Sequence, residues 1–308
     1  MTALFASTLV GGNALPGLLA AALWGGGDFA GSYAVKLGGG TVRASLRVVV
    51  IGHLLSLLAL VATGLALHVP LHDPRVLVWA LVGGVVSGTA LMAFYLALAN
   101  GHMGAGAAVS GLLCAAIPAV VSALQEGAPG WKRLVGFGLA AAAIWLVASA
   151  SNPEHTDEDR ATARKSMLLS VLGGLGFGVY FTALKFSSGA GVVWSTAAAR
   201  VGSWGVSALL LAGTLLFARR RNDDIEPPSH ISARNFWWIL GGSLLDLGGN
   251  LAFVTATRMG RLDVAAVLAS LYPAGTILLA AGLLHEKTNT RQRMGMVLAL
   301  PAVVLVTL

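Results

Sequence analysis

Charged residues are what this sequence has least of. Only 11% of its 308 residues are Asp, Glu, Lys or Arg, whereas about 25% is usual in a soluble domain. Hydrophobic residues make up 56%, and the mean hydropathy is +0.79. So few polar side chains cannot cover the outside of a soluble fold that holds this much apolar surface. The composition therefore excludes a soluble globular protein and a disordered chain, and it leaves a polytopic membrane protein.

Two further shortages narrow the class of protein. Cys114 is the only cysteine, which excludes a disulfide scaffold. No glycine is followed by Lys-Ser or Lys-Thr, so no phosphate loop supports ATP-driven transport. The formal charge of +7 would suggest nucleic acid in a soluble protein, but here it is loop charge that bears on orientation in the membrane. The first 14 residues carry no basic segment, so we do not expect a cleaved signal peptide.

Long apolar runs set the number of membrane spans. The stretches 48–72 and 76–125 contain no Asp, Glu, Lys or Arg. These runs are continuous rather than alternating, which favours helices over a barrel. A spanning helix needs about 20 residues. The sequence therefore predicts an all-α polytopic membrane protein with ten transmembrane helices, over 15–36, 44–67, 76–99, 103–125, 132–150, 166–186, 193–217, 236–257, 262–284 and 292–308.

The two halves of the chain repeat each other. Gly101 aligns with Gly260 and Gly136 with Gly295 at the same offset of 159 residues. We therefore predict a first five-helix repeat over 1–150, a polar linker over 151–165 and a second five-helix repeat over 166–308. An odd number of helices in each unit inverts the second unit, and inverted repeats of secondary transporters hold the substrate near the midplane. The alternative is that apolar helices resemble one another by composition alone.

Several short motifs occur in an order that resembles a known family. They are Trp24-Gly25, Asp28-Phe29, Arg47, Ser-Leu-Tyr-Pro at 270–273, and the acidic helix ends Glu126 and Glu286. Together they resemble the ten-helix EamA-type branch of the drug/metabolite transporter (DMT) superfamily. The resemblance implies two inverted five-helix units around a central cavity. It also implies movement of small metabolites, often amino acids or toxic compounds, commonly outward. The family often has Gly-Glu where this chain has Gln125-Glu126 and His285-Glu286.

Four ionisable residues, two Asp, one Arg and one His, lie well inside predicted spans, away from the helix ends, where a charge is costly and marks a functional site by default. Asp28 follows three glycines in the first helix and is a candidate to carry a proton or bind a cation; alternatively it is a structural partner of Lys36 or an arginine. Asp246 is a second candidate for proton coupling. Asn250 follows it at i+4 on the same helix face, and together they could grip an ammonium or hydroxyl group.

For each of the other two ionisable residues, the sequence allows both a functional and a structural role. Arg200 could bind a carboxylate or phosphate, or its side chain could extend to the membrane interface. His53 is a candidate proton relay, or a hydrogen-bonded packing residue.

Further cavity candidates are uncharged. They are Tyr95, Ser110, Tyr180, Trp194, Trp204 and Tyr272. The alternative for the aromatic members is the belt at the membrane interface, which fits Trp237 and Trp238 better. Pro118 and Pro273 are expected to kink helices that face the cavity. Two glycine pairs with GxxxG spacing, Gly84-Gly88 and Gly174-Gly178, predict close helix contacts.

The leading functional hypothesis is a secondary active transporter that exports small polar metabolites, such as amino acids or related toxic compounds, by alternating access. It is not expected to be an enzyme, and we expect no cofactor and no metal. The alternative is a passive facilitator or channel-like permease. A remote alternative is an intramembrane aspartic protease, because residues 25–28 read Gly-x-Gly-Asp and Asp246 could supply the second carboxylate.

The transporter hypothesis and the apolar composition also predict the partners and the location of the protein. The substrate is a small molecule, the surroundings are the lipid bilayer of the inner (plasma) membrane crossed many times, and nucleic acid is not a partner. A monomer is the expected state. Thirteen basic residues fall at odd-numbered connections and six at even-numbered ones. Positive charge marks the cytoplasmic side, so this count places both termini outside. The family resemblance implies both termini inside, and both readings stay open.

Overall fold

The computed structural model describes residues 12–100, 103–148, 157–221, 232–283 and 290–307, and within them all regular structure is helical. The α-helices are α2 (Ala14–Leu37), α3 (Val42–Ala66), α4 (Leu77–Asn100), α5 (Met103–Glu126), α6 (Trp131–Ala148), α7 (Asp157–Ser187), α8 (Val192–Arg221), α9 (Ala233–Met259), α10 (Leu262–Ala269), α11 (Tyr272–Leu283) and α12 (Thr290–Thr307). Two short 3-10 turns, Pro74–Val76 and Ser188–Ala190, precede α4 and α8.

These helices match the ten predicted spans, with α10 and α11 together forming the ninth. Seven segments of the described chain are long and apolar enough to cross a membrane by length and composition. The prediction of an all-α polytopic membrane protein is confirmed. Of the predicted polar linker 151–165, residues 157–165 form the start of α7, and residues 151–156 lie outside the described residues. The stretch from there to Lys165 contains no Gly or Pro that would break a helix.

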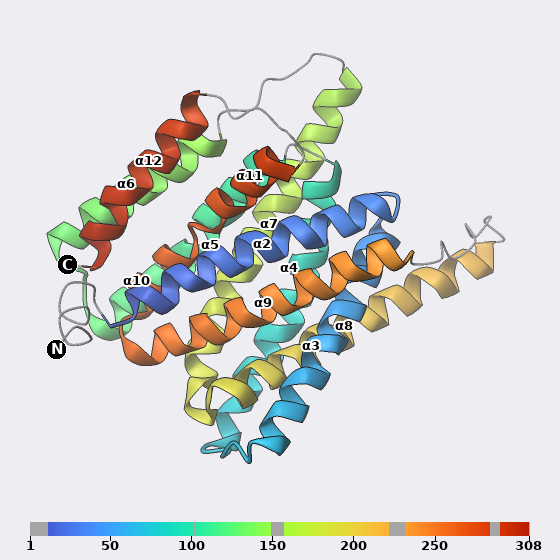
Figure 1. Cartoon of the computed structure of the whole chain (residues 1–308), viewed down its shortest axis with the longest axis horizontal. Coiled ribbons are helices and arrows are strands. Elements are labelled where there is room, and N and C mark those ends of the chain that lie inside the picture. Colours follow the sequence, from blue (N-terminus) through green and yellow to red (C-terminus); the bar gives the residue numbers. More distant parts are fainter. Residues whose placement is uncertain (1–11, 101–102, 149–156, 222–231, 284–289, 308) are drawn as a thin grey trace.

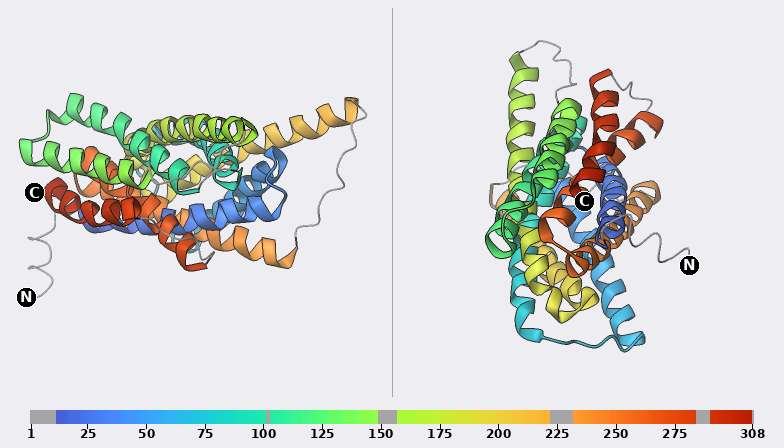
Figure 2. Two further views of the ribbon diagram at one scale, coloured as in Figure 1. Left: turned by 90° about the horizontal axis from the view of Figure 1, so that it is seen from above. Right: turned by 90° about the vertical axis from the view of Figure 1, so that its left-hand side faces the viewer.

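The two halves pack into one another rather than side by side. Helix α2 lies along α9, and α4 lies along α7, while α3 contacts α8 and α6 contacts α12 (Figure 1). Likewise α5 packs on α7, and α10 and α11 pack on α2. When each helix of the first half is exchanged for its counterpart in the second, this set of pairings is unchanged. The start of α2 and the end of α12 lie toward the same end of the molecule (Figures 1 and 2), as an even number of crossings requires.

Glycines permit the closest of these helix contacts. A Cβ at Gly84 or Gly88 would collide with the backbone of Ala199 or Ser203 on α8. A Cβ at Gly174 would come within 2.8 Å of the Ser110 backbone on α5. The predicted role of these GxxxG glycines in close packing is therefore confirmed.

The ninth helix is broken near its middle. Helix α10 ends at Ala269 and α11 begins at Tyr272, immediately before Pro273. Proline has no N–H to donate and its ring clashes with the preceding turn, so the helix cannot run through this point undisturbed. Helix α5, in contrast, continues through Pro118. Of the two predicted kinks, the one at Pro273 is a break that places Tyr272 at the start of a new helix.

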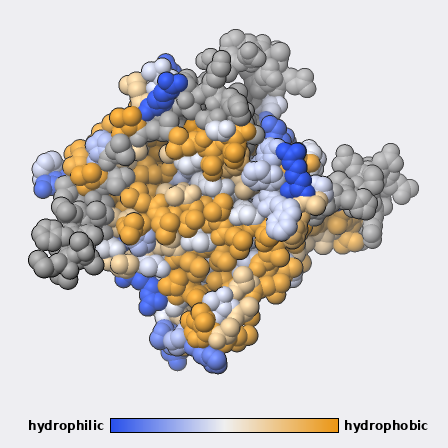
Figure 3. Space-filling model, viewed as in Figure 1, coloured by the Kyte–Doolittle hydropathy of each residue, from blue (hydrophilic) through white to orange (hydrophobic). Residues whose placement is uncertain are grey.

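The outer surface is apolar, as Figure 3 shows for one face. Large hydrophobic side chains such as Leu124, Trp131 and Leu209 are exposed there, which suits contact with lipid tails. Trp237 is also exposed, in keeping with a belt position. Trp238 is not: its ring packs edge-on against Tyr33 and Phe29 at centroid distances of 5.0 and 6.0 Å.

Candidate functional site

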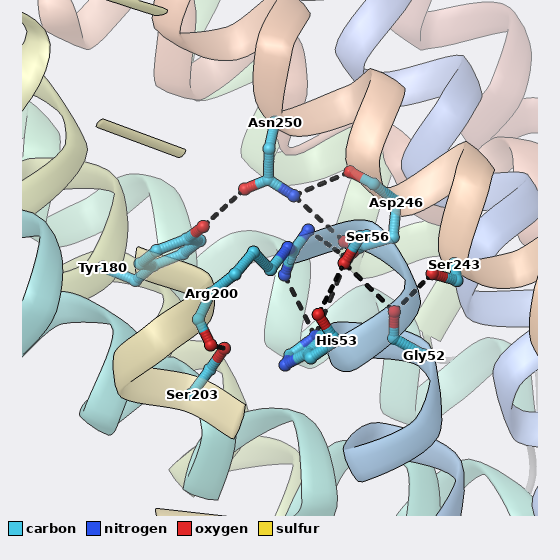
Figure 4. A network of polar contacts seen from close by, with 9 residues as sticks. All are labelled: Gly52, His53, Ser56, Tyr180, Arg200, Ser203, Ser243, Asp246 and Asn250. Carbon is cyan, nitrogen blue, oxygen red and sulfur yellow. Dashed lines mark hydrogen bonds and ion pairs between the residues drawn. The ribbon is translucent and has the colours of Figure 1, made fainter. Parts of the chain in front are cut away.

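A buried ion pair lies at the centre of the molecule. Arg200 on α8 is 2% exposed, and its Nη2 donates a short charge-assisted hydrogen bond to Oδ2 of Asp246 on α9 (Figure 4). Snorkelling to the interface, the alternative reading of Arg200, is therefore wrong. A charge this deep in a membrane protein needs a partner, because an unpaired charge there costs several kcal/mol. The pair joins α8 to α9.

His53 on α3 completes the contacts of the guanidinium. Its Nε2 lies 3.0 Å from Nη1 of Arg200 and 3.8 Å from Oδ2 of Asp246. The guanidinium can only donate, so Nε2 accepts, the proton sits on Nδ1 and the imidazole is neutral. The Nδ1 atom is buried without a partner within the described chain. His53 therefore extends the network to a third helix without adding a charge.

The network continues to α7 through an amide. Asn250 donates to Oδ1 of Asp246 at 3.1 Å and accepts from the Tyr180 hydroxyl at 2.6 Å. Both side chains are almost fully buried. The i+4 spacing of Asp246 and Asn250 thus places both on one face of α9, as predicted. Four helices, α3, α7, α8 and α9, are connected by this one chain of polar contacts.

Two serines, which sequence reasoning missed, lie beside His53, and one of them, Ser243, joins α9 to α3. The hydroxyls of Ser56 and Ser243 both donate to the backbone carbonyl of Gly52 (Figure 4). A Cβ at Gly52 would lie 3.5 Å from the Cβ of Ser243, which is ordinary van der Waals contact. Serine is common in this chain, so composition alone could not single these two out.

A pocket opens beside the ion pair. It is lined by Trp24, Asp28, Ser87, Leu91, Phe177, Tyr180, Phe181, Arg200, Asp246 and Tyr272. The centre of a water-sized sphere can move through about 30 Å³ of it, which is room for about two waters, since one needs about 10–15 Å³. The pocket is therefore too small for a metabolite, which can enter only if the surrounding helices move apart.

Asp28 lies in the wall of this pocket and is 8% exposed. Within the described part of the chain its carboxylate forms no ion pair and no side-chain hydrogen bond. A structural pairing with Lys36 or an arginine, the alternative expected from sequence, is therefore not seen. The neighbouring glycines bring other helices close: a Cβ at Gly27 would lie 3.2 Å from the backbone of α9, and one at Gly25 would collide with α11.

The other predicted residues lie near the pocket or away from it. Tyr95 is buried beside Asp28 and packs on Gly31, but it is not part of the pocket wall. Ser110 is fully buried in the contact of α5 with α7. Trp194 lies farther out and donates from Nε1 to the carbonyl of Val69 at 2.9 Å. Trp204 is partly buried outside the pocket wall, and its Nε1 has no partner among the described residues.

Several residues of the pocket wall were not predicted from the sequence. They are Trp24, Ser87, Leu91, Phe177 and Phe181. Trp24 precedes Asp28 by four residues and Phe177 precedes Tyr180 by three, so helical spacing could have placed these two on the faces already chosen. Phe181 shares a face with Phe177, which it follows by four residues. Nothing local marks Ser87 or Leu91. Among the residues that the structure describes, no three His, Cys, Asp or Glu side chains converge to hold a metal ion.

These features define a class of protein. The chain is an integral membrane protein with a small pocket, lined by Asp28, Arg200, Asp246 and mainly apolar side chains, between helices of both its halves. Residues 164–308 match the model of the EamA-like transporter family. The resemblance to the EamA-type branch of the DMT superfamily is confirmed, and it implies a membrane transporter of the DMT type.

A solved structure supports the fold over nearly the whole chain. The structure, titled "Crystal structure of protein", has a TM-score of 0.68 to this chain and covers 96% of this chain and 96% of its own. The two sequences are 16% identical, so the likeness shows the fold alone. No curated protein matches the sequence.

Proposed function

We propose that this protein is a secondary active transporter that moves small polar metabolites, such as amino acids or related toxic compounds, by alternating access. The observation that carries the proposal is the pocket, whose wall combines α2 and α4 of the first half with α7, α8, α9 and α11 of the second. A site built between two repeated units is the usual place for substrate in transporters of this architecture. Opening the contacts on one side or the other exposes the same site to either face of the membrane.

The polar network supports this role. Burying Arg200 and Asp246 costs desolvation that a stable fold does not require, since apolar side chains of the same size are often as good or better. Buried charges in membrane spans therefore mark substrate or ion pathways. Because the pair bridges α8 and α9 beside the pocket, its geometry changes when those helices separate, and it can sense an arriving substrate.

One end of the bundle carries a second cluster of charges. Arg261, just before α10, donates to the carbonyls of Glu126 and Gly127 at the end of α5 and binds the buried carboxylate of Asp263 at 2.9 Å. The hydrogen bond with Asp263 raises the pKa of Arg261, so the side chain stays charged. This cluster, the Arg261 latch, fastens the end of α5 to the start of α10, and we propose that it releases when that side opens.

The proposal includes a direction of transport and a location. The protein acts in the plasma (inner) membrane, and transport runs outward. Outward transport is supported by the resemblance to the EamA-type branch, which implies export of metabolites. It acts as a monomer, with a small molecule and the bilayer as its only partners.

Purified protein in liposomes tests the proposal. We expect uptake of labelled amino acids or organic cations that depends on an imposed pH gradient, and at least a tenfold loss in Asp246→Asn. Asp73→Asn, an Asp outside the spans near the start of α4, is the matched control and keeps full flux. Gradient-independent flux that never exceeds equilibrium would instead indicate a passive facilitator. Absence of any flux would contradict the proposal.

The geometry disfavours the alternative that the protein is an aspartic protease. An aspartic protease needs two carboxylates that share one proton. Asp28 and Asp246 do line one pocket, but the Asp246 carboxylate is already paired with Arg200. Cleavage of a membrane-spanning peptide that stops in Asp28→Asn would revive this alternative.

A further inference from the structure

The ionisable groups of the pocket do not balance in charge. Asp246 is neutralised by Arg200, and His53 accepts from the guanidinium and is neutral. Asp28 remains, and within the described chain no cationic nitrogen lies within ion-pair distance of its carboxylate. The ionised pocket thus carries one negative charge more than it has positive charges. A buried excess charge is costly, so the site favours a bound proton or a bound cation.

The Asp28 side chain lines the pocket and is not paired with another side chain of the described residues. It is more than nine-tenths buried. The titratable groups around it are Asp246, Tyr95, Tyr272 and Cys114, together with Arg200 across the pocket. The first four bring no positive charge, and the arginine is committed to Asp246. Within the described residues nothing neutralises Asp28, which leaves this carboxylate for a proton or a ligand.

Aromatic rings form much of the remaining wall. Of the ten lining residues, Trp24, Phe177, Tyr180, Phe181 and Tyr272 are aromatic. Trp24 stacks on Phe181 with ring centroids 4.8 Å apart and 7° between the planes, which fixes both rings. A carboxylate beside ring faces is a favourable setting for an ammonium group, because the rings attract the cation without needing hydrogen bonds.

We propose that the pocket selects a small organic monocation with an apolar or aromatic body, whose ammonium group pairs with Asp28. This inference rests on the proposed transport function and narrows its substrate class. A zwitterionic amino acid fits less well, because its carboxylate would have to compete with Asp246 for the single arginine. A proton and the ammonium cannot both occupy Asp28, so one proton leaves the carboxyl group when one cation binds, and the charge of the pocket is conserved.

Four ligands that each carry one phenyl ring but differ in charge test whether the pocket selects a cation. They are 2-phenylethylammonium (a cation), 2-phenylethanol (neutral), 3-phenylpropanoate (an anion) and phenylalanine (a zwitterion). Calorimetry on the purified protein in two buffers of different ionisation heat gives both affinity and proton release. We expect the cation to bind at least tenfold more tightly than each of the others, with release of up to one proton. Equal or tighter binding of phenylalanine or the neutral alcohol, or no binding of any probe, overturns the selection.

Two variants test whether Asp28 binds the cation. In Asp28→Asn we expect at least tenfold weaker binding of the cation, no proton release and an unchanged affinity for the alcohol. Asp73→Asn binds the cation as the parent protein does. Retention of the cation within twofold in Asp28→Asn overturns the role of Asp28. If that variant fails to fold, the ranking of the four probes on the parent protein still decides the proposal. Gradient-driven flux of phenylalanine that does not depend on Asp28 would overturn the cation class and leave the transport function standing.

Discussion

At the scale of single residues, the ion pair is the feature whose loss should cost most. Asp246→Asn or Arg200→Met leaves one buried charge without its partner, and we expect a loss of about 3–5 kcal/mol of stability in either single variant. The double variant Arg200→Met with Asp246→Leu removes both charges and should recover most of this loss, while transport stays absent.

The only cysteine provides the measurement. Cys114 is fully buried, so a thiol-reactive fluorophore added to detergent-purified protein reports its exposure on heating. A melting temperature of the double variant as low as that of the single variants would contradict the expected recovery and show that the pair has a structural role beyond charge balance.

Tyr180→Phe tests the outer part of the network. The change removes the hydroxyl that donates to Asn250 at 2.6 Å and leaves the amide oxygen buried without a donor, so we expect a loss of about 1–3 kcal/mol. Tyr33→Phe is the matched control, because its hydroxyl accepts from Arg234 at an exposed position and should contribute little. Thermal unfolding of the two variants side by side checks this. Equal melting temperatures would show that the Tyr180 contact is dispensable.

The sequence predicted a part of the site at this scale. Arg200, Asp246 and Asp28 stood out because charge inside a span is costly, and Asn250 followed from helical spacing. The pairing itself did not follow. Asp28 and Asp246 looked equivalent in sequence, and only the fold shows that one is neutralised by Arg200 while the other faces the pocket.

At the scale of helices, glycine contacts decide how closely the two halves approach. A Cβ at Gly84 would collide with the Ala199 carbonyl, so Gly84→Ala should push α4 from α8 and cost about 1–3 kcal/mol. Gly213→Ala in α8 is the control: a Cβ there meets no atom within 4 Å of the described chain, and alanine there should be neutral or up to about 1 kcal/mol better. Thermal unfolding of both checks this. A stable Gly84→Ala variant would contradict the close α4–α8 contact.

The Arg261 latch can be tested by hydrogen exchange. Arg261→Gln removes the bonds to the end of α5 and leaves the fully buried Asp263 without its ion pair. We expect faster exchange of backbone amides at the start of α10 and the end of α5, measured by mass spectrometry. Arg258→Gln, at an exposed arginine one turn earlier, should leave these rates unchanged. Equal exchange in all three proteins would show that the latch does not hold this end closed.

The helix boundaries were largely predictable, since apolar runs and charged connections mark them directly. The break in the ninth helix was predicted as a kink at Pro273, because a proline removes a donor wherever it stands. Pro118, with the same local chemistry, leaves α5 unbroken.

At the scale of the whole molecule, labelling of engineered cysteines tests the orientation in the membrane. The excess of basic residues at the odd-numbered connections predicts that this end faces the cytoplasm. In a Cys114→Ser background, Leu71→Cys should then react with an impermeant thiol reagent on intact cells, whereas Val42→Cys at the opposite end should not. Both positions are exposed. The reverse labelling would support the family's usual topology, with both termini inside.

The sequence by itself determined that this chain lives in a membrane, and it predicted ten helical spans in two repeated units. These properties follow from composition and spacing, because the bilayer penalises every unpaired polar group regardless of its neighbours. The tertiary structure alone decided which charges meet. Arg200 and Asp246 come from different helices, as do Asp28 and the rings around it. Whether a buried charge is paired or left for a ligand depends on a few ångströms between helices, and that distance is set by packing.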